Sequence, residues 1–117
     1  MLIISGRVEK GRGLGRELGF PTLNLAYDGD LRGVFAARVT IGERIYKGAA
    51  HVGPKPTLGD EKAICEVFLL DFDGGEIDGE LNVELVEKVR EVMKFESLEA
   101  LKAQIAKDVV AIENLLR

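Results

Sequence analysis

The stretch Val34-Phe-Ala-Ala-Arg-Val-Thr-Ile41 alternates between two kinds of position. Phe35, Ala37, Val39 and Ile41 are all apolar, whereas the intervening positions include an arginine and a threonine. This two-residue period is typical of a strand with one buried face. Gly42-Glu43 follows directly and is a tight hairpin signal, so residues 44–52 are expected to form the antiparallel partner strand.

Similar strand signals recur about every ten residues, with turn residues between them. We expect further strands at residues 2–8, 63–72 and 79–86, and we interpret the ambiguous residues 89–95 as one helical turn. Ser97 is a suitable N-cap for a helix of about five turns, whose apolar residues recur at intervals of three and four: Leu98, Leu101, Ile105, Val109, Ile112 and Leu116. The pattern predicts a mainly β protein, an antiparallel Greek-key barrel with a C-terminal helix packed outside.

Length and composition favour one domain spanning residues 1–117. The chain is 46% hydrophobic and 31% charged, as in soluble globular proteins. No apolar run approaches the roughly 20 residues of a membrane helix, and no basic leader follows Met1. We therefore expect a cytoplasmic protein with no membrane partner.

Two single residues limit the metal chemistry. Cys65 is the only cysteine and His51 the only histidine, which excludes an internal disulfide and a site built from several cysteines or histidines. Any metal used by this chain is expected to be a hard cation held by oxygens.

Charge is distributed unevenly along the chain. Residues 1–60 carry 9 Lys and Arg against 6 Asp and Glu, whereas residues 61–117 carry 7 against 14, for a net charge of −4. An anionic ligand is therefore expected to meet the first half of the chain. The net charge also argues against nucleic acid as a partner.

The segment from Glu9 to Asn24 combines a flexible part with a stiff one. Four glycines with Lys10, Arg12 and Arg16 among them cannot hold a regular helix, and Pro21 then imposes extended geometry, in which Thr22 and Asn24 point the same way. Such a basic flap joined to two oxygen ligands would suit a nucleoside triphosphate and its magnesium ion. The alternatives stay open: a plain surface loop for the flap, and turn formation for Thr22 and Asn24.

Glu66 is the anomalous residue of the strand at 63–72. Alternation places Ile64, Glu66, Phe68, Leu70 and Phe72 on one face of that strand, and both faces are largely apolar. A buried carboxylate costs several kcal/mol unless it is paired or protonated, and it is a ready general base. The alternative is that Glu66 lies at a barrel rim and pairs with an arginine.

Taken together, these segments closely resemble the riboflavin kinase (flavokinase) family over nearly the whole chain. The resemblance rests on Gly11-Arg-Gly-Leu-Gly-Arg-Glu-Leu-Gly-Phe-Pro-Thr-Leu-Asn24, Gly33-Val-Phe-Ala36, Val52-Gly-Pro-Lys-Pro-Thr57, Cys65-Glu-Val-Phe-Leu-Leu-Asp-Phe72, Arg90, Lys94-Phe95 and the helix from Ser97. Its Pro-Thr-x-Asn element is the most specific part.

The resemblance implies a closed six-stranded barrel and transfer of the γ-phosphate of ATP to the 5′-hydroxyl of riboflavin, giving FMN. It implies that Glu66 is the catalytic base and that Thr22 and Asn24 hold Mg²⁺ and the ATP phosphates. It also implies nucleotide contacts from Gly11 and Arg16 and flavin contacts from Arg90 and Phe95. We expect a monomer with riboflavin and ATP as its small-molecule partners. The bifunctional relatives of this family carry an N-terminal adenylyltransferase domain, which this chain is not expected to contain.

Three positions depart from the family pattern. Phe68 stands where a histidine is usual, Asp78 where a tyrosine is usual, and His51 where an asparagine is usual. Phe68 is compatible with packing, whereas Asp78 removes an aromatic ring and adds negative charge near phosphates. A catalytically impaired flavin- or nucleotide-binding barrel is therefore the alternative function, and an oligonucleotide-binding barrel is a third, disfavoured by few aromatic residues and an acidic chain.

Overall fold

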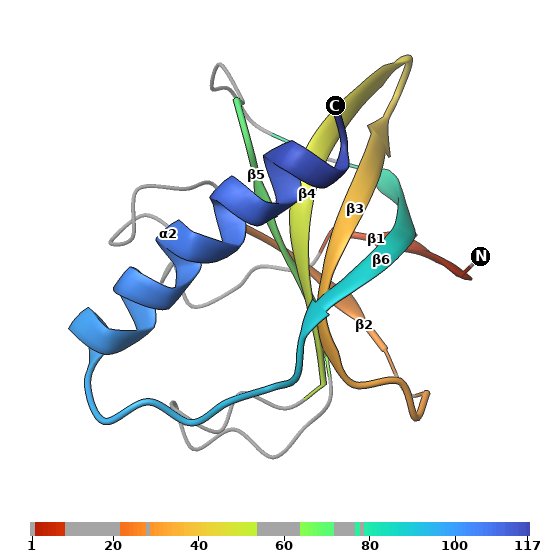
Figure 1. Ribbon diagram of the computed structural model, residues 1–117. Helices are drawn as coiled ribbons and strands as arrows, with labels where there is room; N and C mark the ends of the chain where they lie inside the picture. The colour runs from red at the N-terminus through yellow and green to blue at the C-terminus, as the bar shows by residue number, and fades with distance from the viewer. Residues whose placement is uncertain (1, 9–21, 28, 54–63, 72–76, 78) are drawn as a thin grey trace.

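The computed structural model describes residues 2–8, 22–27, 29–53, 64–71, 77 and 79–117 (Figure 1). These residues form six strands and a helix near the C-terminus, in agreement with a mainly β fold. The elements are β1 (Leu2–Arg7), β2 (Thr22–Ala26), β3 (Gly33–Ile41), β4 (Arg44–Gly53), β5 (Ile64–Leu69), β6 (Glu80–Arg90) and α2 (Leu98–Leu115).

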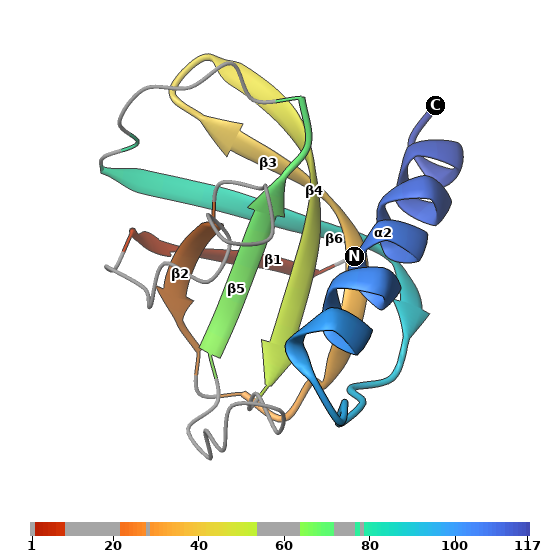
Figure 2. The same cartoon turned by 90° about the vertical axis from the view of Figure 1, so that its left-hand side faces the viewer.

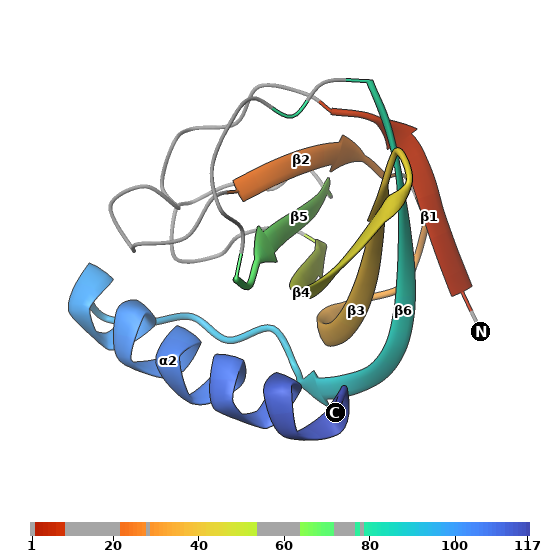
Figure 3. The same cartoon turned by 90° about the horizontal axis from the view of Figure 1, so that it is seen from above.

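All six strands belong to one antiparallel sheet. Hydrogen-bonded neighbours follow the order β1-β6-β3-β4-β5-β2. The sheet curls strongly, and α2 lies outside the curl (Figure 3). The two edge strands, β1 and β2, approach each other to within 8 Å between Cα atoms. The molecule is therefore a curled half-barrel with a helix on its convex side.

The β3–β4 hairpin forms where the alternating sequence predicts it. Its register pairs Ile41 with Arg44 and continues without interruption to Gly33 opposite Val52. Gly42 occupies the turn with a φ of 62°, a left-handed conformation that glycine adopts without steric cost. The hairpin prediction is confirmed.

Two apolar clusters lie on opposite faces of the sheet. The larger fills the concave side, and its buried members come from all six strands: Ile4, Leu23, Leu25, Phe35, Ala37, Val39, Ala50, Val52, Cys65, Val67, Leu69, Leu81, Val83 and Leu85. The smaller lies between the convex side and α2: Ala36, Ala49, Phe68, Leu70, Ile105, Ile112 and Leu116. The alternation expected for β5 is confirmed, because Cys65 and Val67 belong to the first cluster and Phe68 to the second.

The structure corrects the boundaries of β6. We expected a strand ending at Val86 and a helical turn at 89–95, but β6 continues to Arg90 and residues 91–95 have no regular structure. The continuation depends on pairing with β3, which carries β6 past two register irregularities, between Val34 and Phe35 and between Ala36 and Ala37. Long-range pairing of this kind overrides local helix propensity.

Helix α2 begins as predicted. The Ser97 hydroxyl accepts a hydrogen bond from the Ala100 amide at 3.1 Å, which satisfies one of the unpaired donors of the first turn. The helix packs mainly against β3, β4 and β6. In the part of the chain that the structure describes, no helix is both long and apolar enough to span a bilayer.

Candidate functional site

Asn24, Glu66 and His51 lie side by side on three neighbouring strands. Glu66 of β5 is the direct partner of Asn24 in β2 and of His51 in β4. Directly opposite residues of antiparallel strands project from the same face, with Cβ atoms about 4.5–5.5 Å apart. Glu66 is therefore flanked on both sides by residues with hydrogen-bonding side chains.

The same row of paired residues continues across the sheet. His51 pairs with Val34 of β3, and Val34 pairs with Arg90 of β6. The row Asn24–Glu66–His51–Val34–Arg90, which we call the site row, lies on the convex side of the sheet, where α2 also packs; Figure 2 shows the strands side by side. Cross-strand pairing thus connects the predicted base with a predicted flavin residue.

The β2–β5 ladder makes Thr22 and Asn24 neighbours of Glu66 on one face of the sheet, with Thr22 opposite Phe68 and Asn24 opposite Glu66. Direct pairing brings the candidate metal ligands within one strand spacing of the candidate base.

Glu66 is 3% exposed and Asn24 6% exposed. Burial of an amide and a carboxylate side by side costs free energy unless both groups are partnered. The thiol of Cys65, the chain neighbour of Glu66, lies on the opposite face in the concave cluster. Burial, with a further contribution from the charge of Glu66, raises the pKa of Cys65 to about 12.

The Oδ1 atom of Asn24 is a buried acceptor that has no hydrogen-bond partner among the residues that the structure describes. Buried acceptors are normally satisfied by a protein group, an ordered water or an ion, so this oxygen is available to a ligand donor or a cation. An amide oxygen beside a carboxylate is a donor set that Mg²⁺ accepts. Among the described residues, no group of three or more His, Cys, Asp or Glu side chains is placed to hold a metal ion.

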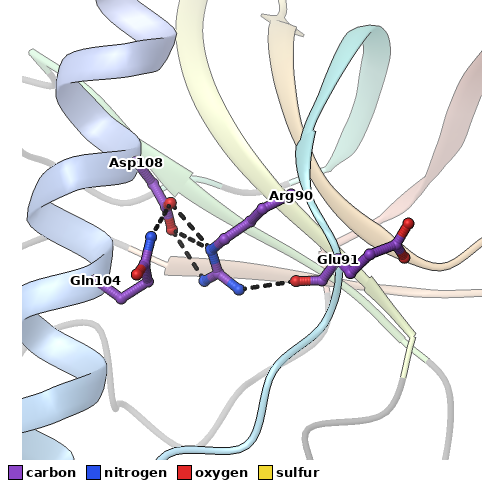
Figure 4. A network of polar contacts seen from close by, with 4 residues as sticks. All are labelled: Arg90, Glu91, Gln104 and Asp108. Atoms are coloured by element: carbon purple, nitrogen blue, oxygen red, sulfur yellow. Dashed lines mark hydrogen bonds and ion pairs between the residues drawn. The ribbon is translucent and has the colours of Figure 1, made fainter.

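Arg90 and Phe95, the two residues expected to contact the flavin, lie together. The guanidinium carbon of Arg90 is 5.6 Å from the centre of the Phe95 ring, within cation–π range. Arg90 also forms an ion pair with Asp108 of α2, with an Nη2–Oδ2 distance of 2.9 Å (Figure 4). The structure thus gives Arg90 a role between sheet and helix that its sequence position did not reveal.

Some predicted residues fall outside the described ranges. Gly11 and Arg16, expected to contact the nucleotide, are among them, as is Asp78, the most disruptive departure from the family pattern. Phe68 is described: it is 7% exposed and packs in the cluster beneath α2, in agreement with its interpretation as a packing residue.

Sequence reasoning did not assign a function to two residues, His51 and Asp108. His51 was noted only as a departure, because the register that places it beside Glu66 is not visible in one strand alone. Asp108 could have been found: it lies three residues after Ile105 and four before Ile112, on the apolar face of α2, and is 3% exposed.

Comparison with known proteins identifies relatives of the whole chain. The family model described as Flavokinase, riboflavin kinase, matches residues 1–116. A bifunctional riboflavin kinase/FMN adenylyltransferase of Pseudomonas fluorescens is 44% identical over 116 residues, covering 96% of this chain and 37% of the relative. The RNA-binding riboflavin kinase RibR of Bacillus subtilis is 39% identical over 116 residues, covering 96% of this chain and 50% of the relative.

Two crystal structures share the fold. A macrolide-efflux protein from Streptococcus pneumoniae is 31% identical with a TM-score of 0.81, covering 97% of this chain and 38% of that one. A riboflavin kinase from Trypanosoma brucei is 23% identical with a TM-score of 0.67, covering 97% of this chain and 78% of that one. The chain spans half or less of the length of the two curated relatives named above. Because one relative is named as RNA-binding, the expected absence of a nucleic-acid partner stays a prediction.

Proposed function

The chain belongs to the riboflavin kinase family, and from that premise we propose that it transfers the γ-phosphoryl group of ATP to the 5′-hydroxyl of riboflavin, giving FMN and ADP. The observation that carries the proposal is the buried pair of Asn24 and Glu66, directly opposite each other and flanked by His51. Phosphoryl transfer depends mainly on positioning and on neutralising phosphate charge. In this proposal Asn24 would hold the cation that neutralises the charge, and Glu66 would accept the proton of the attacking hydroxyl.

Glu66 is the proposed general base. It accepts the proton of the riboflavin 5′-hydroxyl as the oxygen attacks the γ-phosphorus, and its 3% exposure keeps bulk water from competing for that role. The carboxylate is held on β5, between β2 and β4, so its backbone position is fixed by ladders on both sides. A base on a rigid strand loses little entropy when the hydroxyl arrives.

Thr22 and Asn24 are the proposed ligands of Mg²⁺ and of the ATP phosphates. The orphaned Oδ1 of Asn24 supports this assignment, since a cation would satisfy it. When bound, Mg²⁺ neutralises charge on the transferring phosphoryl group. Gly11 and Arg16 are proposed to contact the nucleotide, and Phe95 the flavin.

The fold is proposed to be the closed Greek-key barrel that the family resemblance implies. The order β6-β3-β4-β5 supports it, because three successive strands with the fourth returning beside the first define a Greek key. The approach of β1 to β2 within 8 Å supports closure. A single domain accounts for all of these elements.

The test is incubation of the chain with riboflavin, Mg²⁺ and ATP, CTP or GTP in turn, followed by chromatography for FMN. We expect FMN with at least one nucleotide, and a loss of about 10²–10⁴-fold in Glu66→Gln with retained riboflavin binding. Glu84→Gln, on the exposed side of β6, is the matched control and should keep full activity. Tight flavin binding without FMN under any nucleotide would favour the alternative, a binding barrel without kinase activity; near-normal turnover in Glu66→Gln would exclude Glu66 as the base.

A further inference from the structure

The guanidinium of Arg90 is held by protein groups at each of its three nitrogens. Nε donates to both carboxylate oxygens of Asp108 at 3.0 Å, Nη2 lies 2.9 Å from Oδ2 of the same residue, and Nη1 donates to the carbonyl oxygen of Glu91 at 3.1 Å (Figure 4). Arg90 therefore connects the end of β6, the segment that follows it and helix α2.

Asp108 is buried and has a second hydrogen-bond partner besides Arg90. Its side chain is 4% exposed and that of Arg90 14% exposed, and Gln104, one turn earlier in α2, donates from Nε2 to Oδ1 at 3.0 Å. A buried ion pair is tolerated only when its geometry and its further hydrogen bonds are good, and removal of one partner leaves a costly unpaired charge. The forked contact also requires an arginine, since lysine offers a single point charge.

Phe95 lies within reach of the held guanidinium. The ring centre is 5.6 Å from Cζ of Arg90, and the residues between them, 91–94, have no regular structure that would fix the ring by backbone hydrogen bonding. At the other end the chain enters α2 at the Ser97 N-cap. The contact with the guanidinium connects the ring to the sheet and, through Asp108, to the helix.

We propose that Arg90 is a positioning residue, which sets the ring of Phe95 for flavin binding through its ion pair with Asp108 and does not itself touch the flavin. This inference rests on the proposed function for the identity of the ligand. It changes the expected role of Arg90 from a flavin contact to the support of one, and it gives α2 a part in flavin affinity although the helix packs on the far end of the site row.

The test is a double-mutant cycle read by quenching of riboflavin fluorescence, without nucleotide. Asp108→Asn and Arg90→Lys should each weaken riboflavin binding about tenfold, Phe95→Leu by a similar factor, and neither of the first two should cause further loss in a Phe95→Leu background. If Arg90 touched the flavin, its losses would multiply with that of Phe95→Leu. Glu91→Gln is the matched control: Glu91 pairs with Lys88 at 2.6 Å but its side chain is 75% exposed, so binding should not change.

A second measurement keeps the inference separate from the proposed function. Amide hydrogen exchange at the start of α2, where the Ala100 and Leu101 amides donate to Ser97, should accelerate at least tenfold in Asp108→Asn relative to the unmodified chain, whether or not riboflavin is a ligand. Unchanged exchange there would overturn the positioning role. An unmodified chain that neither binds riboflavin nor forms FMN would overturn the proposed function, and the exchange result would still decide the role of the ion pair. Thermal unfolding of each variant verifies that it folds.

Discussion

Asn24 of β2 and Glu66 of β5 are direct partners in an antiparallel ladder, and both are buried on the side of the sheet where α2 packs. The pairing places an acceptor oxygen without a described partner next to a carboxylate. A cation bound beside these two buried oxygen acceptors would offset the free-energy cost of burying them.

Mg²⁺ with ATP should therefore stabilise the chain through Asn24. At a concentration 100 times its Kd, a ligand that binds only the folded state adds about 2.7 kcal/mol to the free energy of unfolding. Thr22→Ala and Asn24→Ala should lose most of this gain, measured as the shift of the thermal midpoint on addition of the ligand. Asn82→Ala, which removes the acceptor for the Ser5 hydroxyl on the exposed side of β6, should keep it; an unchanged shift in Asn24→Ala would contradict the assignment.

His51 should stabilise the fold through Glu66. Replacement of His51 by leucine removes a polar neighbour of a carboxylate that is 3% exposed, and we expect a loss of about 1–3 kcal/mol in denaturant unfolding. The same replacement in a Glu66→Gln background should cost clearly less, because the charge that needed the neighbour is gone. Lys47→Leu, on the same strand and face, is the control; equal losses in both backgrounds would show that His51 acts independently of Glu66.

Replacement of Gly48 even by alanine should lower the stability of the fold. A Cβ added to it would lie 3.0 Å from Val39 Cγ2 and 3.1 Å from Val67 Cγ1, inside the concave cluster. We expect Gly48→Ala to destabilise by about 1–3 kcal/mol through overpacking. The matched control is Gly6→Ala, where the nearest atom, Leu25 Cδ2, is at an ordinary 3.8 Å, and where urea midpoints should change little.

Cys65 should make the fold less stable at alkaline pH. Burial raises the pKa of its thiol from the ordinary value near 9 to about 12, so between these values the unfolded state binds fewer protons and the free energy of unfolding falls as pH rises. Cys65→Val should remove this part of the decline, which urea unfolding at pH 8, 9.5 and 10.5 would measure; parallel declines in the two proteins would contradict the prediction.

Local patterns in the sequence predicted most of the fold. Alternation in residues 34–41 and the Gly42 turn identified the central hairpin, and Ser97 identified the start of α2, because each of these signals depends on neighbours in the chain. The helical turn expected at 89–95 was wrong for the opposite reason: β6 continues to Arg90 through pairing with Val34, a residue more than fifty positions away.

Local sequence signals identified single residues of the candidate site, but they did not show which of these residues are neighbours. Glu66 stood out because a carboxylate interrupts an apolar strand, and Asn24 because of its spacing from Thr22. That the two are neighbours, with His51 on the other side, depends on the β2–β5 and β4–β5 registers, which no single segment contains. The partner of Arg90 likewise lies 18 residues further along the chain, in a different kind of element.

The two faces of β5 have different roles: one packs in the core and the other carries a candidate site residue. Cys65 and Val67 belong to the concave cluster, while Glu66 belongs to the convex face one residue away. A substitution in the concave cluster and a substitution beside Glu66 therefore act on opposite faces of the same strand, so the stability of the core and the candidate site can be altered separately.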